Sequence, residues 1–335
     1  MTVAAPSGVA VTGTFGADRR TWSSTGPLSF ATSYAVTAAA VNTTGSVQTT
    51  EASVSTAEPA ALVFPALTPA PALRDIGVGQ PIRVEFLHSP DDKSHVAPVD
   101  RAAIQQALRV TVNPPQPGGW YWINSSVVDY RPETFWKPGT TITVNAGIFG
   151  ASFGKGAYGR VSRQATYKVH GTMVAVADGA TENMNIYDST DLSTPIRQIP
   201  ISLGSTANGT PTHAGIHVVV GVEQANPYIM NSCTYGLCPP APGAYVAEEY
   251  NAVRISDDGE FVHTNVHSLG DQGRANVSHG CININVDDGK WFYTHFKMGD
   301  VVIVKNSGGP PLPVGDMWGD WSLTWSQWSA GNATS

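Results

Sequence analysis

Residues 72–168 contain a series of short strand-like runs, and this series constrains the fold more than any other feature of the sequence. Such runs, separated by Pro and Gly turns, are typical of immunoglobulin-like β-sandwiches, which take about 100 residues. The segment DRAAIQQAL (100–108) is the exception and predicts a short helix with Asp100 as its N-cap. We therefore expect an immunoglobulin-like module over residues 58–168. Its strand-like runs are GQPIRVEFL, ALRVTVNP, GWYWIN, SVVDYRP and TTITVNAGIFG.

Residues 1–57 suggest a second, partial module of the same kind. They hold the runs GVAVTGTFG, RTWSST and TSYAVTAAAVNT, about half of what a sandwich needs. A Pro-rich connector, TAEPAALVFPALTPAP (56–71), follows them. With 34 Gly, 24 Pro and only 13% charged residues, the composition favours strands over long helices. The expected fold is mostly β, with tandem immunoglobulin-like modules at its start.

The pattern changes at residue 169, and we expect a separate β-rich domain over residues 169–306. GIHVVVGVE (215–223) and DVVIVKN (300–306) are strand-like, and residues 287–296 predict a short helix with an acidic first turn. Residues 307–335 form a Trp-rich extension, whose Trp spacings of three, four and three would place four indoles on one helical face. We expect this stripe to pack on the domain at 169–306, with a carbohydrate-stacking surface as the alternative. The residues are Trp318, Trp321, Trp325 and Trp328.

Several classes of function find no support in the sequence. The formal net charge is −7 without a basic stripe, which argues against a nucleic-acid partner. No apolar stretch approaches the ~20 residues of a membrane span. GASFGKG (150–156) lacks the spacing and the Ser or Thr of a phosphate-binding loop. The start MTVAAPSGVAV has no features of a signal peptide, so we expect either a cytosolic protein or a processed piece of an exported one.

In the stretch NVSHGCIN (276–283), Cys281 lies among residues that donate or accept hydrogen bonds or allow the backbone to turn, rather than in an apolar run. A thiol becomes a nucleophile beside a histidine or oriented amides, and His263 ends the strand-like run GEFVHTN. Gly280 would let consecutive amides converge on one point, as an oxyanion hole requires. We therefore interpret Cys281 as catalytic rather than as a buried structural residue.

Fourteen residues separate His263 from the sequence Ser-His-Gly-Cys-Ile-Asn, and this pattern resembles the signature of the L,D-transpeptidases, whose catalytic domain is of the YkuD type. The resemblance continues through YIMNSCTYG, WFYTHFKMGDVV and GDWSLTWSQWSAGN and is closest to the mycobacterial enzymes with upstream immunoglobulin-like domains. It implies that Cys281 is the nucleophile and His263 its proton-transfer partner. It also implies that the backbone carbonyl of Thr264 or of a neighbouring residue orients the imidazole, although Ser is common at position 264 in the family. His279, Ser278 and Gly280 would shape the site.

The resemblance also implies a set of substrate contacts. Tyr245 falls on a lid over the pocket, and Met230 falls where a lid residue lines the substrate channel, although both residue types also serve as packing. Gly259 matches a backbone position that contacts substrate, while Asp258 replaces a commonly small or polar residue. Asn283 would touch substrate or brace the loop. The substrate-binding residues expected are Tyr245, Gly259, Asn283, Met230 and Thr264.

The cysteines and histidines allow two further arrangements. Cys233 and Cys238 stand five residues apart, close enough for a disulfide in an oxidising compartment, while two free thiols are the alternative. A zinc site built from His263, His279 and Cys281 is chemically feasible, but no HExxH motif or carboxylate pattern supports it. We therefore expect no metal.

The resemblance implies a peptidoglycan L,D-transpeptidase without a cofactor. The thiol would attack a donor stem tetrapeptide, expel D-Ala and pass the acyl group to the amine of an acceptor stem, giving a 3→3 cross-link. Carbapenems, a class of β-lactams, would acylate the same thiol. The alternatives are an L,D-carboxypeptidase, in which water replaces the amine, and a non-catalytic wall-binding module. The expected location is the cell envelope or periplasm, with a membrane anchor in an N-terminal segment absent from this chain.

Overall fold

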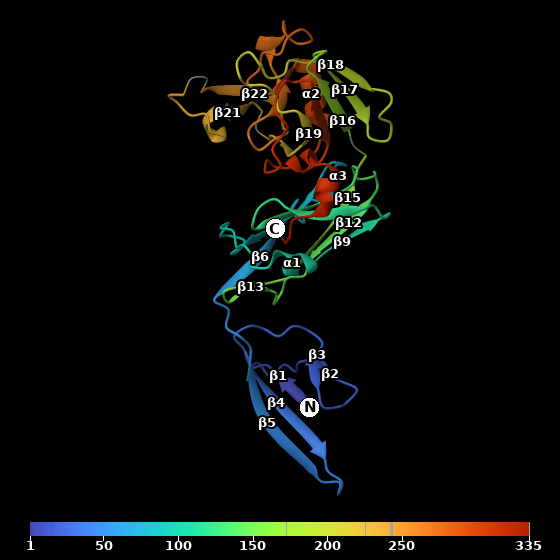
Figure 1. Ribbon diagram of the computed structural model, residues 1–335, viewed down its shortest axis with the longest axis vertical. Coiled ribbons are helices and arrows are strands. Elements are labelled where there is room, and N and C mark those ends of the chain that lie inside the picture. The colour runs from blue at the N-terminus through green and yellow to red at the C-terminus, as the bar shows by residue number, and fades with distance from the viewer. Residues whose placement is uncertain (172, 225, 242–243, 335) are drawn as a thin grey trace. The chain divides into compact units, whose positions relative to one another are not determined.

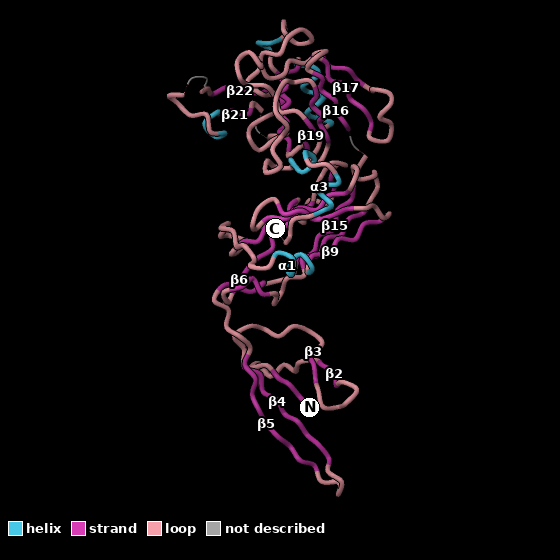
Figure 2. The backbone as a smooth tube through the Cα atoms, viewed as in Figure 1, coloured by secondary structure: helices cyan, strands magenta, loops and turns pink. Residues whose placement is uncertain are grey.

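The computed structural model describes residues 1–171, 173–224, 226–241 and 244–334, and strands make up most of its regular structure (Figures 1 and 2). The mostly β fold expected from the sequence is therefore confirmed. No helix among these residues is long and apolar enough to cross a membrane. The chain forms two compact units, and β6 (Ala61–Thr68) and β8 (Ile82–Leu87) each run across the division. The first unit comprises Met1–Pro65, Phe86–Ala107 and Gly147–Ser162, and the second comprises Ala66–Glu85, Leu108–Ala146 and Arg163–Ser335.

The first unit contains a long hairpin between β4 and β5, with β1 on the other side of β4 (Figure 1). Every residue of β5 is exposed, and Val3 and Tyr34 are among the few buried apolar residues of this sheet. The predicted helix at residue 100 is confirmed, since the Asp100 side chain accepts a hydrogen bond from the Ala103 amide at its first turn. The elements are β1 (Thr2–Ala4), β2 (Gly13–Phe15), β3 (Trp22–Ser24), β4 (Ser33–Val41), β5 (Val47–Ser55), α1 (Arg101–Gln106), β13 (Ser152–Gly154) and β14 (Ala157–Gly159).

The upstream part of the second unit contains the strands that the sequence predicts between the Pro and Gly turns. One sheet has the order β7-β15-β12-β9, and β11 pairs with both β10 and β8. On β12, Ile142, Val144 and Ala146 are buried while their neighbours are not, so the side chains alternate as in a sandwich sheet. These elements are β7 (Asp75–Ile76), β9 (Leu108–Asn113), β10 (Gly118–Trp122), β11 (Val127–Pro132), β12 (Thr141–Ala146) and β15 (Arg163–Val169).

The rest of the second unit contains two further sheets, with strand orders β18-β17-β16-β25-β19 and β20-β22-β23-β24. Apolar side chains from both sheets form one buried cluster, which includes Ile186, Val262 and Phe292. The elements are β16 (Met173–Asp178), β17 (Asn183–Asp188), β18 (Arg197–Pro200), β19 (Gly215–Val218), β20 (Gly221–Val222), β21 (Tyr228–Asn231), η1 (Ser232–Tyr235), β22 (Val246–Arg254), β23 (Phe261–Thr264), η2 (Val266–Ser268), β24 (Ile282–Ile284), α2 (Val286–His295) and β25 (Val301–Lys305).

The parallel pairing of β23 with β24 brings the two halves of the sequence motif together. His263 lies opposite Asn283 in this ladder, so Cys281 lies just before the start of β24, next to the histidine strand. Helix α2 follows β24 directly and is capped by Asn285, whose side chain accepts from the Asp288 amide. The helix approaches β23 so closely that a Cβ on Gly289 would lie 1.9 Å from the Thr264 side chain. The sheet and the helix therefore hold the histidine strand from two sides.

The Trp-rich tail differs from the prediction of one continuous helical face. It folds into a 3-10 helix, η3 (Gly319–Ser322), an extended Leu323 and a short helix, α3 (Trp325–Ala330). The break arises because Thr324 caps α3 through a capping box with Gln327 and so starts a new helix. Helix α3 lies against β10, whereas η3 lies against β19. The expected packing of the tail on the domain at 169–306 is therefore found for η3 but not for α3.

The tail is held by buried indoles and by one buried cation. The Trp328 indole nitrogen donates to the Gly119 carbonyl of β10 at 2.8 Å, and Trp328 is fully buried. The Arg131 guanidinium lies 4.6 Å from the ring centres of both Trp321 and Trp328, and it also donates to the Leu323 carbonyl at 2.8 Å. A cation between two indole faces is stabilised by the ring quadrupoles. Trp328 is therefore a packing residue rather than part of a carbohydrate-stacking surface.

We expect Trp328→Ala to lower the free energy of unfolding by about 3–5 kcal/mol, because it removes a fully buried indole and leaves a cavity. Trp325→Ala is the matched control: this indole lies in the same helix but is only partly buried, and its ring centre is 5.8 Å from Arg131. Denaturant unfolding monitored by circular dichroism measures both changes. Equal losses in the two variants would contradict this account of the tail.

Candidate active site

The turn that precedes Cys281 is closed by the side chain of Ser278. The Ser278 hydroxyl donates to the Cys281 carbonyl at 2.6 Å and accepts from the Gly280 amide at 3.1 Å. The Thr212 hydroxyl donates to the Gly280 carbonyl at 2.7 Å. Gly280 has a backbone φ of 128°, a conformation that residues other than glycine rarely adopt. The sequence predicts that Gly280 lets consecutive amides of this turn converge on an oxyanion, whereas the Gly280 amide itself is bonded to the Ser278 hydroxyl.

The thiol of Cys281 lies at the base of a pocket of about 330 Å³. The residue is only 7% exposed and packs against Met230, Ala252 and Phe261, so it is more buried than a polar turn suggests. Its Sγ lies 3.7 Å from the Gly259 carbonyl oxygen. The pocket gives a ligand access to a thiol that is otherwise enclosed. Its lining includes Tyr245, Glu249, His263, Ser278, His279 and Asn283.

His263 is 2% exposed and has two acceptors at its Nδ1 atom. The Glu249 Oε2 atom lies 2.7 Å from Nδ1, and the Thr264 carbonyl oxygen lies 3.2 Å from it. Burial by itself lowers the pKa of this imidazole, but hydrogen bonds with Cys281 and Glu249 outweigh burial and raise the pKa of His263 to about 10. With Nδ1 occupied, Nε2 is the ring nitrogen left for the thiol.

Glu249 is the site residue that the sequence analysis missed. Its carboxylate is 13% exposed and belongs to β22, fourteen positions before His263 in the chain. The segment AEEYN (247–251) offers two adjacent glutamates, and only the pairing of β22 with β23 decides which of them faces the histidine. The Thr264 carbonyl lies where the resemblance implies, so the imidazole has both a carbonyl and a carboxylate acceptor.

Two polar side chains lie at the mouth of the pocket. The Tyr245 ring lies 5.4 Å from the exposed ring of His279. Burial, followed by the charges of Cys281 and Glu249, raises the pKa of Tyr245 above its usual range. Its hydroxyl therefore stays protonated and can donate a hydrogen bond. His279 is exposed, whereas the imidazole of His263 is buried.

The remaining predicted substrate contacts differ in what they can offer a ligand. Gly259 has a φ of 101°, and a Cβ there would lie 2.6 Å from the Tyr235 ring, so this position requires glycine. Met230 is 1% exposed, and its place in the apolar cluster around Cys281 favours a packing role. Asn283 donates to the Ser268 hydroxyl at 3.2 Å, while its buried Oδ1 accepts nothing from the residues described. Asn283 is therefore held by the residues around Cys281, and its amide oxygen is buried.

A lid segment, residues 228–241 together with Ala244 and Tyr245, covers the apolar side of the site. A disulfide joins Cys233 to Cys238 within it. The Tyr228 ring stacks on Phe261 of β23 at 5.3 Å, and the Tyr228 hydroxyl lies 2.9 Å from the Tyr235 hydroxyl. Residues 242 and 243, which also belong to the lid expected from the sequence, lie outside the described part of the chain. The disulfide therefore closes a loop that rests on the histidine strand.

We expect mild reduction of the Cys233–Cys238 bridge to weaken the apparent affinity for a bulky stem peptide several-fold. The reason is that opening this small loop gives the lid more conformational freedom, which binding of the peptide must then remove. Reaction of Cys281 with a small thiol reagent should stay nearly unchanged, since the thiol turn is held by other residues. A double variant, Cys233→Ser with Cys238→Ser, should not respond to reductant. If reduction slows both reactions equally, the bridge stabilises the fold and has no specific role in the lid.

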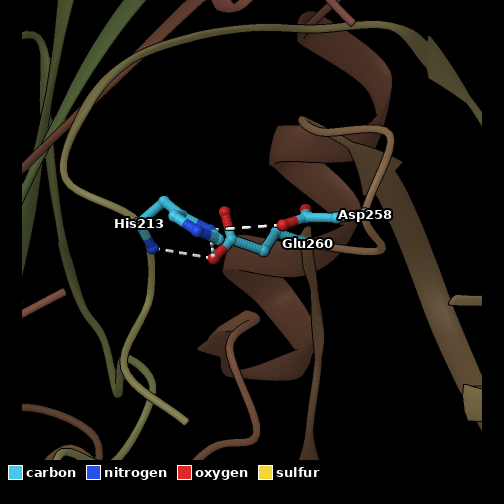
Figure 3. A group of neighbouring side chains, drawn as sticks. All are labelled: His213, Asp258 and Glu260. Atoms are coloured by element: carbon cyan, nitrogen blue, oxygen red, sulfur yellow. Dashed lines mark hydrogen bonds and ion pairs between the residues drawn. The ribbon is translucent and has the colours of Figure 1, made fainter. Parts of the chain in front are cut away.

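One cluster among the described residues has the side chains to hold a metal ion: His213, Asp258 and Glu260 (Figure 3). The His213 Nδ1 atom lies 3.1 Å from Glu260 Oε1 and 3.3 Å from Asp258 Oδ2, and the His213 amide also donates to Glu260 Oε1. The hydrogen bond with Glu260 raises the pKa of His213 above its usual value. A Cβ on Gly280 would lie 3.8 Å from Glu260 Oε1, so the cluster supports the cysteine turn from behind. The zinc set considered from the sequence does not form such a cluster in the described residues.

Comparison with known proteins gives one consistent result. Residues 173–304 match the model of the L,D-transpeptidase catalytic domain, and residues 1–152 match that of a bacterial Ig domain. The chain is 35% identical to L,D-transpeptidase 2 of Mycobacterium tuberculosis over 99% of its own length and 78% of that protein. It is 31% identical to L,D-transpeptidase 5 of the same species, covering 96% and 68% of the two chains.

Two solved structures share the architecture. An LD transpeptidase in complex with imipenem superposes with a TM-score of 0.59 at 26% identity, covering 74% of this chain and all of that one. L,D-transpeptidase 3 of Mycobacterium tuberculosis gives a TM-score of 0.54 at 25% identity, covering 72% and 97%. The expected combination of an immunoglobulin-like region and this catalytic domain is confirmed.

Proposed function

Because the chain belongs to the L,D-transpeptidase family, we propose that Cys281 and His263 together carry out its acyl transfer on peptidoglycan stem peptides. The observation that supports this most strongly is the pairing of β23 with β24, which places a buried imidazole beside an enclosed thiol that opens to one pocket. Members of this family are cysteine-dependent acyltransferases that act on the cell wall, outside the cytoplasm. Membrane anchoring by a segment outside this chain stays a prediction.

The proposed reaction begins with attack of the Cys281 thiolate on the carbonyl that precedes D-Ala in a donor tetrapeptide. A tetrahedral oxyanion forms, and the Tyr245 hydroxyl is positioned at the pocket to donate to it. The imidazolium of His263 gives its proton to the departing amine, so D-Ala leaves and a thioester remains. Asn283, which lines the same pocket, is proposed to contact the stem peptide or to brace the turn.

The second half of the reaction decides between transfer and hydrolysis. The amine of an acceptor stem attacks the thioester and gives its proton to His263, which regenerates the thiolate and forms a 3→3 cross-link. If water attacks instead, the product is a tripeptide and the protein is an L,D-carboxypeptidase. Incubation with disaccharide-tetrapeptides, followed by mass analysis of the products, distinguishes the two. We expect dimers with release of D-Ala, whereas tripeptide monomers alone would replace this proposal with hydrolysis.

We also propose that carbapenems acylate Cys281. The solved relatives support this, since one is described as a complex with imipenem and another as carrying a faropenem-derived adduct. A strained β-lactam carbonyl presents the same target to the thiolate as the donor peptide does. When the lactam ring opens, its nitrogen takes the proton of His263, and the carbapenem stays bound to Cys281 as a thioester.

A further inference from the structure

The strand that carries Glu249 is irregular at one place, directly opposite the catalytic histidine. On β22, Tyr250 pairs with Thr264 and Val253 pairs with Val262, so two residues of β22 face the single position of His263. The extra residue is a β-bulge, a feature that redirects neighbouring side chains and often lies next to active sites.

The bulge is fixed in place by its own residues. Asn251 has a φ of 53°, and its side chain donates to the Thr264 hydroxyl at 2.9 Å. Since side chains alternate along a strand, Glu249 lies on the same face as His263, diagonal to it across the ladder. Its neighbour Glu248 is exposed on the other face, where it accepts from the Tyr250 hydroxyl at 3.3 Å.

We infer that Glu249 is a positioning residue for the acyl transfer: its carboxylate holds the His263 ring with Nε2 toward the thiol and stabilises the cation on that ring. The inference rests on the proposed function, which it extends by a third member of the reacting group. The geometry supports it, because Glu249 Oε2 is nearer to Nδ1, at 2.7 Å, than the Thr264 carbonyl is, at 3.2 Å. A hydrogen bond to an ionised acceptor is about twice as strong as one to a neutral carbonyl.

The proton balance of the reaction shows when Glu249 acts. His263 is cationic before acylation, neutral after it protonates the leaving amine, and cationic again after it takes the proton of the acceptor amine. The Glu249 carboxylate would favour both cationic stages, as the carboxylate of a Ser-His-Asp triad does. A dipole such as the Thr264 carbonyl can orient the ring, but it cannot neutralise the positive charge.

The charged groups around His263 also support a role for Glu249 in stabilising the cationic ring. Cys281 approaches from the turn before β24 and Glu249 from β22, and both hydrogen-bond to the ring and raise its pKa against the effect of burial. Tyr245 approaches from the lid and remains neutral, since burial keeps its pKa high. The other titratable groups that line this pocket are His267, Asp271 and His279.

The test compares Glu249→Gln with Glu248→Gln, a matched control that removes the same charge from the next residue of the strand. Nuclear magnetic resonance of labelled histidine rings follows the titration of His263 in folded protein. We expect Glu249→Gln to move the titration midpoint of His263 down by about one pH unit or more, a tenfold or larger change in proton affinity. Glu248→Gln should leave the titration midpoint of His263 at the wild-type value.

Identical His263 titration in Glu249→Gln and the wild type would overturn the inference. If Glu249→Gln does not fold, the wild-type spectrum decides instead: the inference requires both ring nitrogens of His263 to be protonated at neutral pH, and a neutral ring would overturn it. Neither readout needs a peptidoglycan substrate. A protein that shows the shift but forms no acyl-enzyme would therefore refute the proposed function and leave the role of Glu249 in place.

Discussion

Cys281→Ala and Cys281→Ser are expected to abolish cross-linking, with a loss of at least about 10³-fold in turnover, while the protein stays folded. The loss follows because the thioester cannot form without Sγ, and a serine hydroxyl is far less ionised than a thiol at neutral pH. Cys281 packs against Met230 and Phe261, so removal of its sulfur costs stability of about 1 kcal/mol. Serine fills the same space and should cost less packing than alanine does.

Circular dichroism and a muropeptide cross-linking assay measure the two halves of this expectation. Replacement of Cys233 and Cys238 by serine is a control for the circular dichroism only, since it removes sulfur from the same domain without touching the thiol turn. Cross-linking by Cys281→Ala at the wild-type rate would end the interpretation of Cys281 as the nucleophile.

His263→Ala is expected to slow acylation by about 10²–10⁴-fold, because general acid–base transfer at the thiol and at the leaving amine is lost. The substitution also leaves Glu249, which is 13% exposed, without its partner, so a fall in stability should accompany the kinetic effect. His279→Ala is the control and should impair acylation much less, because this ring is exposed at the mouth of the pocket.

Single-turnover acylation, measured by stopped-flow with a chromogenic β-lactam, separates this effect from slow product release. Thermal unfolding of each variant shows whether the protein is folded under the assay conditions. Acylation of His263→Ala at the wild-type rate, or an equal loss in His279→Ala, would show that the proton-transfer residue is assigned wrongly.

Local patterns in the sequence predicted much of this fold. Proline and glycine turns marked the strands of the upstream sheets, and Asp100 marked the start of α1, because these residues act through nearby backbone geometry. The acidic first turn likewise located α2. The tail was predicted less well, since the Trp spacing is compatible with a helix but the capping box at Thr324 divides it. Which surface each indole covers depends on β10 and β19, distant parts of the chain.

For the site as well, the residues of a local motif could be predicted from the sequence, whereas contacts between distant segments could not. Cys281, His263 and the residues of the thiol turn could be proposed from the sequence because the motif is compact and specific. Glu249 could not be proposed in this way, since its role depends on the register between β22 and β23 and on a bulge that no single residue predicts. The orientation of the Gly280 amide was also missed, because the competing Ser278 hydroxyl closes the turn only in the folded structure.

The central claim is that Cys281 forms a covalent acyl-enzyme, and whole-protein mass spectrometry after incubation with a carbapenem tests it most directly. The account predicts that the wild type gains the mass of one carbapenem, that peptide mapping places this adduct on Cys281, and that Cys281→Ala gains nothing. No adduct on folded wild-type protein, or an adduct that persists in Cys281→Ala, would contradict it.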